Sequence, residues 1–389
     1  MRDIAKPEKA DLDRLVAPFL EAQPSGLGFA IGYASPTFSN FGGLYFAGNV
    51  RNQFRTKLGL NATTPFEIAS ITKTFTSTLY ARLIRTVDPK RTVGDYCSPN
   101  GRLPINSVFA PISLDQLMNY TSGLPADNEK SEGTVPRLWP QPYSIQGMMS
   151  FLECPEPDSP LRDLSDRDQK FTYSNLAFAI MSAIIASEEK SSPLGIGAFV
   201  NKMREHIFKP LDIHATFFHE VSLTNLPLGF GYNNWPDPKN DEMPSGHPFF
   251  PAYLGVGGVV ATAQDMFNWL LFNMGIKRNE HLTPLLPALQ EPSTPVMWDE
   301  LRMGLGWFIN PADGEWPGSI FKDGSLGGFG SCMGLLRSPE PGTIPSQAGA
   351  YVLVNASGLK GVRDGYDVAN ELTGDLLNLM HQGSKPLTI

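Results

Sequence analysis

The sequence predicts an α+β fold in which both chain termini form one antiparallel sheet, flanked by helices and joined to a helical subdomain. Short apolar runs bounded by Gly, Pro, Asn and Asp lie near the start and in the last third of the 389 residues. Between them, apolar residues recur at helical spacing among many prolines. Since strand-like segments occupy both ends, we expect the two ends to complete a single sheet.

The N-terminal part predicts a helix, two strands and a second helix, in that order. Residues 8–23 have apolar residues at helical spacing and end at a Pro-Ser-Gly breaker. The runs 26–34 and 42–49 are typical of neighbouring antiparallel strands. The second helix is expected to begin near Ala69 and to continue through an apolar run that ends near Ile84.

The last third predicts a group of short strands and a closing helix. The strand candidates are GLGWFI (304–309), SIFKDGS (319–325), GSCMGLLRS (330–338) and GAYVLVNAS (349–357). Clusters of Gly, Pro and Asp separate them, as expected of turns between strands. The closing helix is expected over about 362–380.

Composition indicates one large folded unit. Hydrophobic residues make up 41% and charged residues 18% of the chain, and we find no internal repeat or long linker. We therefore expect residues 1–389 to form one catalytic domain of two interlocked subdomains. The α/β part would comprise roughly 1–70 and 250–389, and the mainly helical part roughly 71–249.

Charge and targeting signals exclude several kinds of partner. The formal net charge is -8 and no run is rich in Lys or Arg, so we expect no nucleic-acid partner. The N-terminus has no apolar stretch behind its basic residues, which argues against a signal peptide and against membrane insertion. We expect a cytoplasmic protein, or a periplasmic or secreted one if a signal peptide has been removed. The sequence specifies no oligomeric state.

Cysteine and histidine spacing predicts neither a metal site nor a cofactor. Cys97, Cys154 and Cys332 are an odd number and widely spaced, so a disulfide framework is not implied. His214 and His219 are five residues apart, which does not bring two ligands to one face of a helix.

A serine and a lysine with three-residue spacing are candidates for nucleophilic chemistry. In SITK, Ser70 and Lys73 share one face of a helical turn, and a buried lysine with a lowered pKa can take the serine proton. The spacing alone is weak, because it recurs in this chain at Ser187 to Lys190, Ser319 to Lys322 and Ser357 to Lys360. Only Ser70 opens a strongly apolar helix, where a nucleophile gains from the helix N-terminus.

Two further polar motifs are candidates for the same site. YSN places Tyr173 and Asn175 just before an apolar helix, where the phenol could relay protons and the amide could bind substrate. KDGS, followed by a Gly-rich run, reads as a strand that a substrate backbone can approach closely. There Lys322 would supply positive charge, and the backbone N–H groups of Ser325 and Ser70 would form an oxyanion hole.

The three motifs together resemble a known family. SITK, YSN and KDGS occur in the order and rough spacing of the active-site elements of class C β-lactamases, penicillin-binding DD-peptidases and the related family VIII esterases. LMNYTSGLP (117–125) and GVGGVVATAQDMFNWL (255–270) look similar too. The likeness is greatest to the AmpH-type branch, in YSNLAF (173–178) and RDGYDVANELTG (363–374). It covers nearly the whole chain and implies a β-lactamase/transpeptidase-like fold.

The resemblance also implies a role for each motif residue. Ser70 would be the acylated nucleophile, Lys73 its base and Tyr173 the proton relay. Asn175 would bind substrate and the lysine, and Lys322 would be the electrostatic partner of the tyrosine. The reaction would proceed through an acyl-serine ester that water then cleaves.

One position departs from the family pattern. Asp323 stands where the family usually has Thr or Ser, a hydroxyl that helps bind the carboxylate of a β-lactam or a peptide C-terminus. An anion there would repel such a carboxylate, which favours neutral esters. Lys360 appears where the class C pattern carries Asn, and it would either restore a positive carboxylate site or pair with Asp323.

The first functional hypothesis is a serine hydrolase that acts as a carboxylesterase on small neutral esters. The alternative is a β-lactamase or a D-alanyl-D-alanine carboxypeptidase, and the second alternative is a transacylase or a non-catalytic penicillin-binding-like protein. In each catalytic case the partner is a small-molecule ester or amide.

Overall fold

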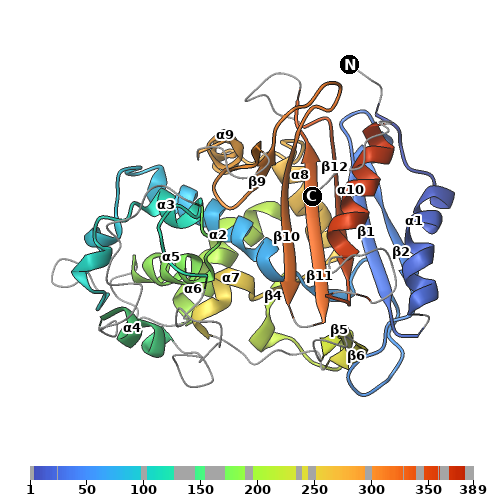
Figure 1. Ribbon diagram of the computed structural model, residues 1–389, viewed down its shortest axis with the longest axis horizontal. Helices are drawn as coiled ribbons and strands as arrows, with labels where there is room; N and C mark the ends of the chain where they lie inside the picture. The colour runs from blue at the N-terminus through green and yellow to red at the C-terminus, as the bar shows by residue number, and fades with distance from the viewer. Residues whose placement is uncertain are drawn as a thin grey trace.

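A seven-stranded antiparallel sheet, with strands from both ends of the chain, organises the structure (Figure 1). The computed structural model describes residues 4–23, 25–97, 103–126, 145–153, 171–188, 196–233, 239–243, 251–293, 300–326, 328–338, 346–357, 359 and 368–381. The strand order is β2-β1-β12-β11-β10-β9-β8. These strands are β1 (Gly28–Ala34), β2 (Gly42–Gly48), β8 (Arg302–Met303), β9 (Phe308–Asn310), β10 (Ser319–Leu326), β11 (Phe329–Leu336) and β12 (Ala348–Val354).

The sheet joins the two ends of the chain through β1 and β12. Ile31 at the middle of β1 lies opposite Tyr45 of β2 on one side and Val352 of β12 on the other. All residues of β1 and β12 are buried, as expected where both faces of a strand are covered. The prediction of an antiparallel sheet completed by both termini is therefore confirmed.

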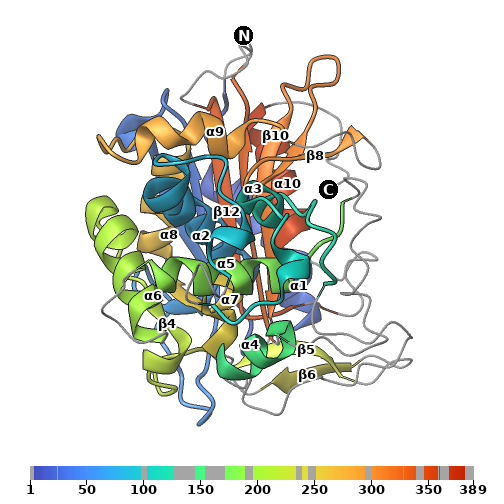
Figure 2. The same ribbon diagram turned by 90° about the vertical axis from the view of Figure 1, so that its left-hand side faces the viewer.

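Helices cover both faces of this sheet. The helices are α1 (Lys9–Ala22), α2 (Thr72–Tyr80), α3 (Leu114–Met118), α4 (Ile145–Glu153), α5 (Asn175–Ser187), α6 (Ile196–Met203), α7 (Leu254–Gly257), α8 (Ala263–Asn273), α9 (Leu286–Gln290) and α10 (Val368–His381). In Figure 1, α1 and α10 lie on one side of the sheet, and their apolar residues form one buried cluster with β1, β11 and β12. In Figure 2 the left-hand side of Figure 1 faces the viewer, and α2, α5, α6 and α7 lie in front of the sheet.

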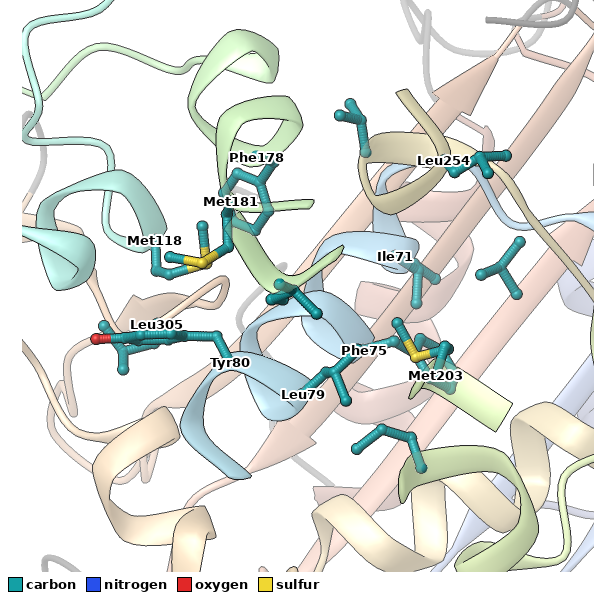
Figure 3. Packing of buried hydrophobic residues seen from close by; sticks show 14 of the residues in the cluster. Ile71, Phe75, Leu79, Tyr80, Met118, Phe178, Met181, Met203, Leu254 and Leu305 are labelled. Atoms are coloured by element: carbon teal, nitrogen blue, oxygen red, sulfur yellow. The ribbon is translucent and has the colours of Figure 1, made fainter. Parts of the chain in front are cut away.

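The helical side has its own large core, in which α2 is central. The Phe75 ring stacks on Trp269 of α8 with 3.8 Å between centroids, and the indole N–H donates to Thr74 Oγ1 at 3.1 Å. Figure 3 shows Phe75 close to Met203, with Ile71 and Leu79 on the same helix. This packing fixes α2, which directly follows the 3-10 turn that carries Ser70.

Two smaller sheets lie outside the seven-stranded sheet. The three-stranded sheet β3-β7-β4 consists of β3 (Pro65–Glu67), β7 (Val259–Thr262) and β4 (Thr216–Phe217), and a hairpin pairs β5 (Gly229–Asn233) with β6 (Lys239–Met243).

Within the described ranges, no helix is long and apolar enough to cross a lipid bilayer.

Most of the elements expected from the sequence are present. The first helix, the two N-terminal strands and the strands that contain KDGS, SCMGLL and YVLV match the expected ranges to within a few residues. The second helix begins as a 3-10 turn at Ala69–Ile71 and continues as α2. The closing helix is α10, and residues 362–367 of its expected range lie outside the described residues.

Candidate active site

Ser70 lies in a tightly held turn between β3 and α2. Ala69 has a φ of 45°, a left-handed conformation that is uncommon for a residue with a side chain. Backbone hydrogen bonding ties Ile68 N–H to the Val259 carbonyl at 3.2 Å, and the Ser331 hydroxyl donates to the Ile68 carbonyl at 2.8 Å. The turn is therefore fixed by both β7 and β11 while Ser70 itself is half-buried.

Lys73 lies one helical turn after Ser70 and reaches it directly. Its Nζ donates to Ser70 Oγ at 2.7 Å and to the Val256 carbonyl at 3.1 Å. The side chain is completely buried, and its Nζ lies 5.1 Å from the centroid of the Tyr173 ring. Such enclosure fixes the amine next to the hydroxyl, because a long flexible side chain has no room to move.

Tyr173 also reaches the Ser70 hydroxyl. Its OH donates to Ser70 Oγ at 3.0 Å. Burial alone would raise the pKa of Tyr173, but the positive charges of Lys322 and Lys73 outweigh it and lower the pKa to about 8. Ser174 supports this position, since its side chain accepts from Ala177 N–H and caps α5.

Lys322 and Asp323 form an ion pair at the edge of the site. Lys322 Nζ lies 2.9 Å from Asp323 Oδ1, and only 1% of the lysine side chain is exposed against 32% of the aspartate. Burial would lower the pKa of Lys322, yet Asp323 and Tyr173 raise it, so the lysine keeps its charge. Burial would raise the pKa of Asp323, yet Lys322 lowers it. Both groups are therefore ionised at neutral pH.

β10 packs its backbone against the nucleophile turn at Gly324. A Cβ at this position would lie 2.7 Å from the Ile68 carbonyl oxygen and 2.8 Å from the Ser70 nitrogen. Only glycine allows this close approach. Ser325 follows on β10 with an exposed side chain, so the residue proposed from the sequence as the second oxyanion donor lies one position beyond the contact.

For Asn175 the structure gives a backbone contact, and for Lys360 it gives no position. Asn175 is the first residue of α5, two positions after Tyr173, and its backbone N–H donates to the Ala126 carbonyl at 2.7 Å. Lys360, expected either to restore a carboxylate site or to pair with Asp323, lies outside the described residues.

The site also contains aromatic residues to which the sequence had assigned no role. The Tyr120 ring lies 4.7 Å from that of Tyr173, and Lys322 Nζ lies 5.1 Å from the centroid of the Phe308 ring. Tyr120 belongs to LMNYTSGLP, a stretch that resembles the family, and Phe308 belongs to the strand candidate GLGWFI. Their position in those stretches is the sequence signal that could have placed them at the site.

This arrangement has the components of acyl transfer. A hydroxyl has a buried amine at 2.7 Å and a phenol at 3.0 Å, and a charged lysine lies beside the phenol. Groups placed in this way can remove a proton from an attacking hydroxyl and return it to a leaving group.

Comparison with known proteins identifies the family. The beta-lactamase family model matches residues 13–372, which is most of the chain. The chain belongs to the beta-lactamase family. As a member, it is a serine hydrolase of the type that includes β-lactamases and DD-carboxypeptidases.

One known enzyme and two solved structures resemble the chain over most of its length. The D-alanyl-D-alanine-carboxypeptidase/endopeptidase AmpH of Escherichia coli is 26% identical over 341 residues, covering 83% of this chain and 77% of AmpH, which supports the AmpH-type likeness. The octameric penicillin-binding protein homologue from Pyrococcus abyssi superposes with a TM-score of 0.71 at 17% identity, covering 96% of this chain and 78% of the homologue. The beta-lactamase/D-alanine carboxypeptidase from Pseudomonas syringae superposes with a TM-score of 0.65 at 17% identity, covering 96% of this chain and 99% of that enzyme. These superpositions confirm the expected β-lactamase/transpeptidase-like fold.

Proposed function

We propose that this serine hydrolase is a carboxylesterase that cleaves small neutral esters through an acyl-serine intermediate. Ser70 is the nucleophile, Lys73 and Tyr173 handle its proton, and the backbone N–H groups of Ser70 and Ser325 bind the developing oxyanion. Asn175 contacts the acyl side of the substrate. No metal or cofactor takes part in these steps.

The steps follow from the two short contacts to the Ser70 hydroxyl. Ser70 Oγ attacks the ester carbonyl carbon while its proton passes to the Lys73 amine, 2.7 Å away, or to the Tyr173 oxygen, 3.0 Å away. The carbon–oxygen bond to the alcohol then breaks, and the alcohol leaves with that proton. Water attacks the acyl-serine carbonyl next, giving a carboxylic acid and the restored Ser70 hydroxyl.

The choice of neutral esters rests on the Lys322–Asp323 ion pair. The lysine charge that could attract a substrate carboxylate is matched at 2.9 Å by the Asp323 carboxylate. Asp323 is also the more exposed of the two, so an approaching anion meets the negative group first. At contact distance such repulsion amounts to about 1 to 4 kcal/mol, depending on the effective dielectric.

Hydrolysis of short p-nitrophenyl esters tests this proposal. We expect turnover by the wild-type protein that is lost in Ser70→Ala and retained in Ser187→Ala. Ser187 has the same three-residue spacing to a lysine but donates its hydroxyl to the Ile184 carbonyl within α5. Turnover that is equal in Ser70→Ala and the wild type would refute the proposal.

A second candidate function is that of a β-lactamase or D-alanyl-D-alanine carboxypeptidase. The observation that favours it is the similarity to AmpH over 83% of this chain. Release of D-alanine from a peptide ending in D-Ala-D-Ala, abolished by Ser70→Ala, would establish it in place of the esterase.

A further inference from the structure

Tyr120 carries a buried hydroxyl that has no hydrogen-bond partner among the described residues. The side chain is completely buried. A buried polar group without a partner is costly, and most native proteins avoid it. This unpartnered hydroxyl belongs to a ring that lies beside the active-site residue Tyr173.

The Tyr120 ring packs directly against Tyr173. The two ring centroids are 4.7 Å apart with 31° between the planes. Phe171, Phe178 and Phe308 surround Tyr120 with centroids 5.6, 5.4 and 6.5 Å away, respectively. The phenol thus lies in a largely apolar enclosure in which the Tyr173 side chain is the reactive neighbour.

The backbone around Tyr120 is built to hold it there. Tyr120 has a φ of 61°, a left-handed conformation that bulky residues seldom adopt. Its carbonyl accepts from Thr172 N–H at 2.9 Å, which ties it to the residue before Tyr173. Thr121 Oγ1 donates to Asn119 Oδ1 at 2.7 Å on the other side. Strain maintained in this way is often found at functional sites.

The two phenols ionise at different pH values. Burial, followed by the charge of Tyr173 and by hydrogen bonding to Tyr173 once that group is ionised, holds the pKa of Tyr120 well above its ordinary value, whereas the pKa of Tyr173 is lowered to about 8. The charged groups that act on Tyr173 are Lys322 and Asp323 from β10 and Lys73 from α2. Around pH 8 and above, Tyr120 is a donor and the Tyr173 oxygen is a strong acceptor.

We propose that Tyr120 is a positioning residue whose hydroxyl donates a hydrogen bond to the Tyr173 oxygen when that oxygen is negatively charged. The unsatisfied donor of the resting state then gains its partner during proton transfer. This inference rests on the proposed function only in that it assigns the Tyr173 phenolate a role in acyl transfer. The interaction itself does not depend on the substrate.

Ultraviolet titration of the tyrosines tests the inference without any substrate. The wild-type protein should show one phenolate component with a midpoint near pH 8 that is absent in Tyr173→Phe. In Tyr120→Phe this component should move to higher pH by about one unit, because a hydrogen bond to the charged form is lost. Tyr120→Met, whose flexible side chain fills the space without a hydroxyl, should give the same shift.

Tyr351→Phe is the matched control. Tyr351 is also completely buried, but its hydroxyl donates to the Ala263 carbonyl away from Ser70. Its loss should lower thermal stability and leave the titration midpoint unchanged. Removing the unpartnered Tyr120 hydroxyl should not lower thermal stability.

The outcomes separate this inference from the proposed function. A midpoint that stays at its wild-type value in both Tyr120 variants overturns the inference, as does a wild-type protein with no phenolate component near pH 8. A shifted midpoint in a protein that cleaves no ester supports the role of Tyr120 while refuting the esterase proposal.

Discussion

The Lys322 ammonium group donates to Asp323 twice, at 2.7 Å to its carbonyl oxygen and at 2.9 Å to Oδ1. Neighbouring residues on a strand ordinarily point to opposite faces, so the alternation of side chains does not by itself predict this contact. β9 pairs with β10 from Ser319 to Phe321, and Asp323 lies beyond that stretch. The Asp323 carboxylate is near enough to the site for its charge to raise the pKa of Tyr173.

Neutralising Asp323 should admit anionic substrates. We expect Asp323→Asn and Asp323→Thr to increase the rate of Ser70 acylation by nitrocefin roughly tenfold or more, because the repulsion of the substrate carboxylate is removed. Hydrolysis of p-nitrophenyl butyrate should change much less. Stopped-flow absorbance at saturating and subsaturating nitrocefin measures the effect.

Asp323→Glu is the control for this prediction, since it keeps the negative charge and should keep the preference for neutral esters. A nitrocefin rate that rises equally in Asp323→Glu and Asp323→Asn would show that shape, and not charge, excludes the anion.

Removing the Lys73 amine should abolish most activity without unfolding the protein. We expect Lys73→Met to lower kcat for ester hydrolysis roughly 100- to 10,000-fold, the usual contribution of a positioned base. Lys209→Met, at an exposed lysine in another part of the fold, should retain wild-type activity. Steady-state kinetics with circular dichroism as a check of folding measures both, and a Lys73→Met enzyme of near wild-type kcat would argue against the base assignment.

Activity should depend on pH through Tyr173. Its pKa is lowered from 10 to about 8, so the phenolate that can accept the Ser70 proton accumulates as the pH rises through 8. We therefore expect kcat/KM to rise up to about pH 8 and then to level off.

In Lys322→Met the rise of kcat/KM with pH should move to higher pH, because the charge of Lys322 lowers the Tyr173 pKa more than any other group does. A profile that is flat between pH 6 and pH 9, about two units below and one above that pKa, would contradict this role of the phenol.

Gly324→Ala should separate β10 from the nucleophile turn. The new Cβ would lie 2.6 to 2.8 Å from Ser331 Oγ, the Ile68 carbonyl oxygen and the Ser70 nitrogen, so the strand must shift. We expect a loss of about 1 to 3 kcal/mol in the free energy of unfolding and a marked fall in ester hydrolysis.

The control is Gly197→Ala in α6, where a Cβ would have no neighbour within 4 Å. Alanine in a helix should raise stability by up to about 1 kcal/mol and leave activity intact. Chemical denaturation measures the free energy of unfolding of both variants. Equal values for Gly324→Ala and Gly197→Ala would contradict the close approach at Gly324.

Much of this architecture could be predicted from sequence because the longer elements carry clear apolar patterns. α1 has apolar residues at helical spacing, whereas β1 and β12 are continuous apolar runs, and all three were placed correctly from the sequence. The sheet β3-β7-β4 was not predicted, because strands of two to four residues are too short to show a period. The division into two interlocked subdomains remains a prediction.

The sequence indicated which residues form the site, but it did not indicate all of their side-chain contacts. The spacing of Ser70 and Lys73 predicted their proximity, which the 2.7 Å contact shows. The contact of Asp323 with the preceding Lys322 and the left-handed backbone conformation of Tyr120 are seen only in the folded structure. Neither is encoded in local patterns, because both arise from tertiary packing.

A side-by-side measurement of kcat/KM for p-nitrophenyl butyrate and nitrocefin, with the wild-type protein and Ser70→Ala, tests the central claim most directly. The Lys322–Asp323 ion pair predicts ester turnover that requires Ser70, with little or no turnover of the anionic nitrocefin. Nitrocefin turnover comparable to that of the ester, and lost in Ser70→Ala, would contradict the account and assign the site to β-lactam or peptide substrates.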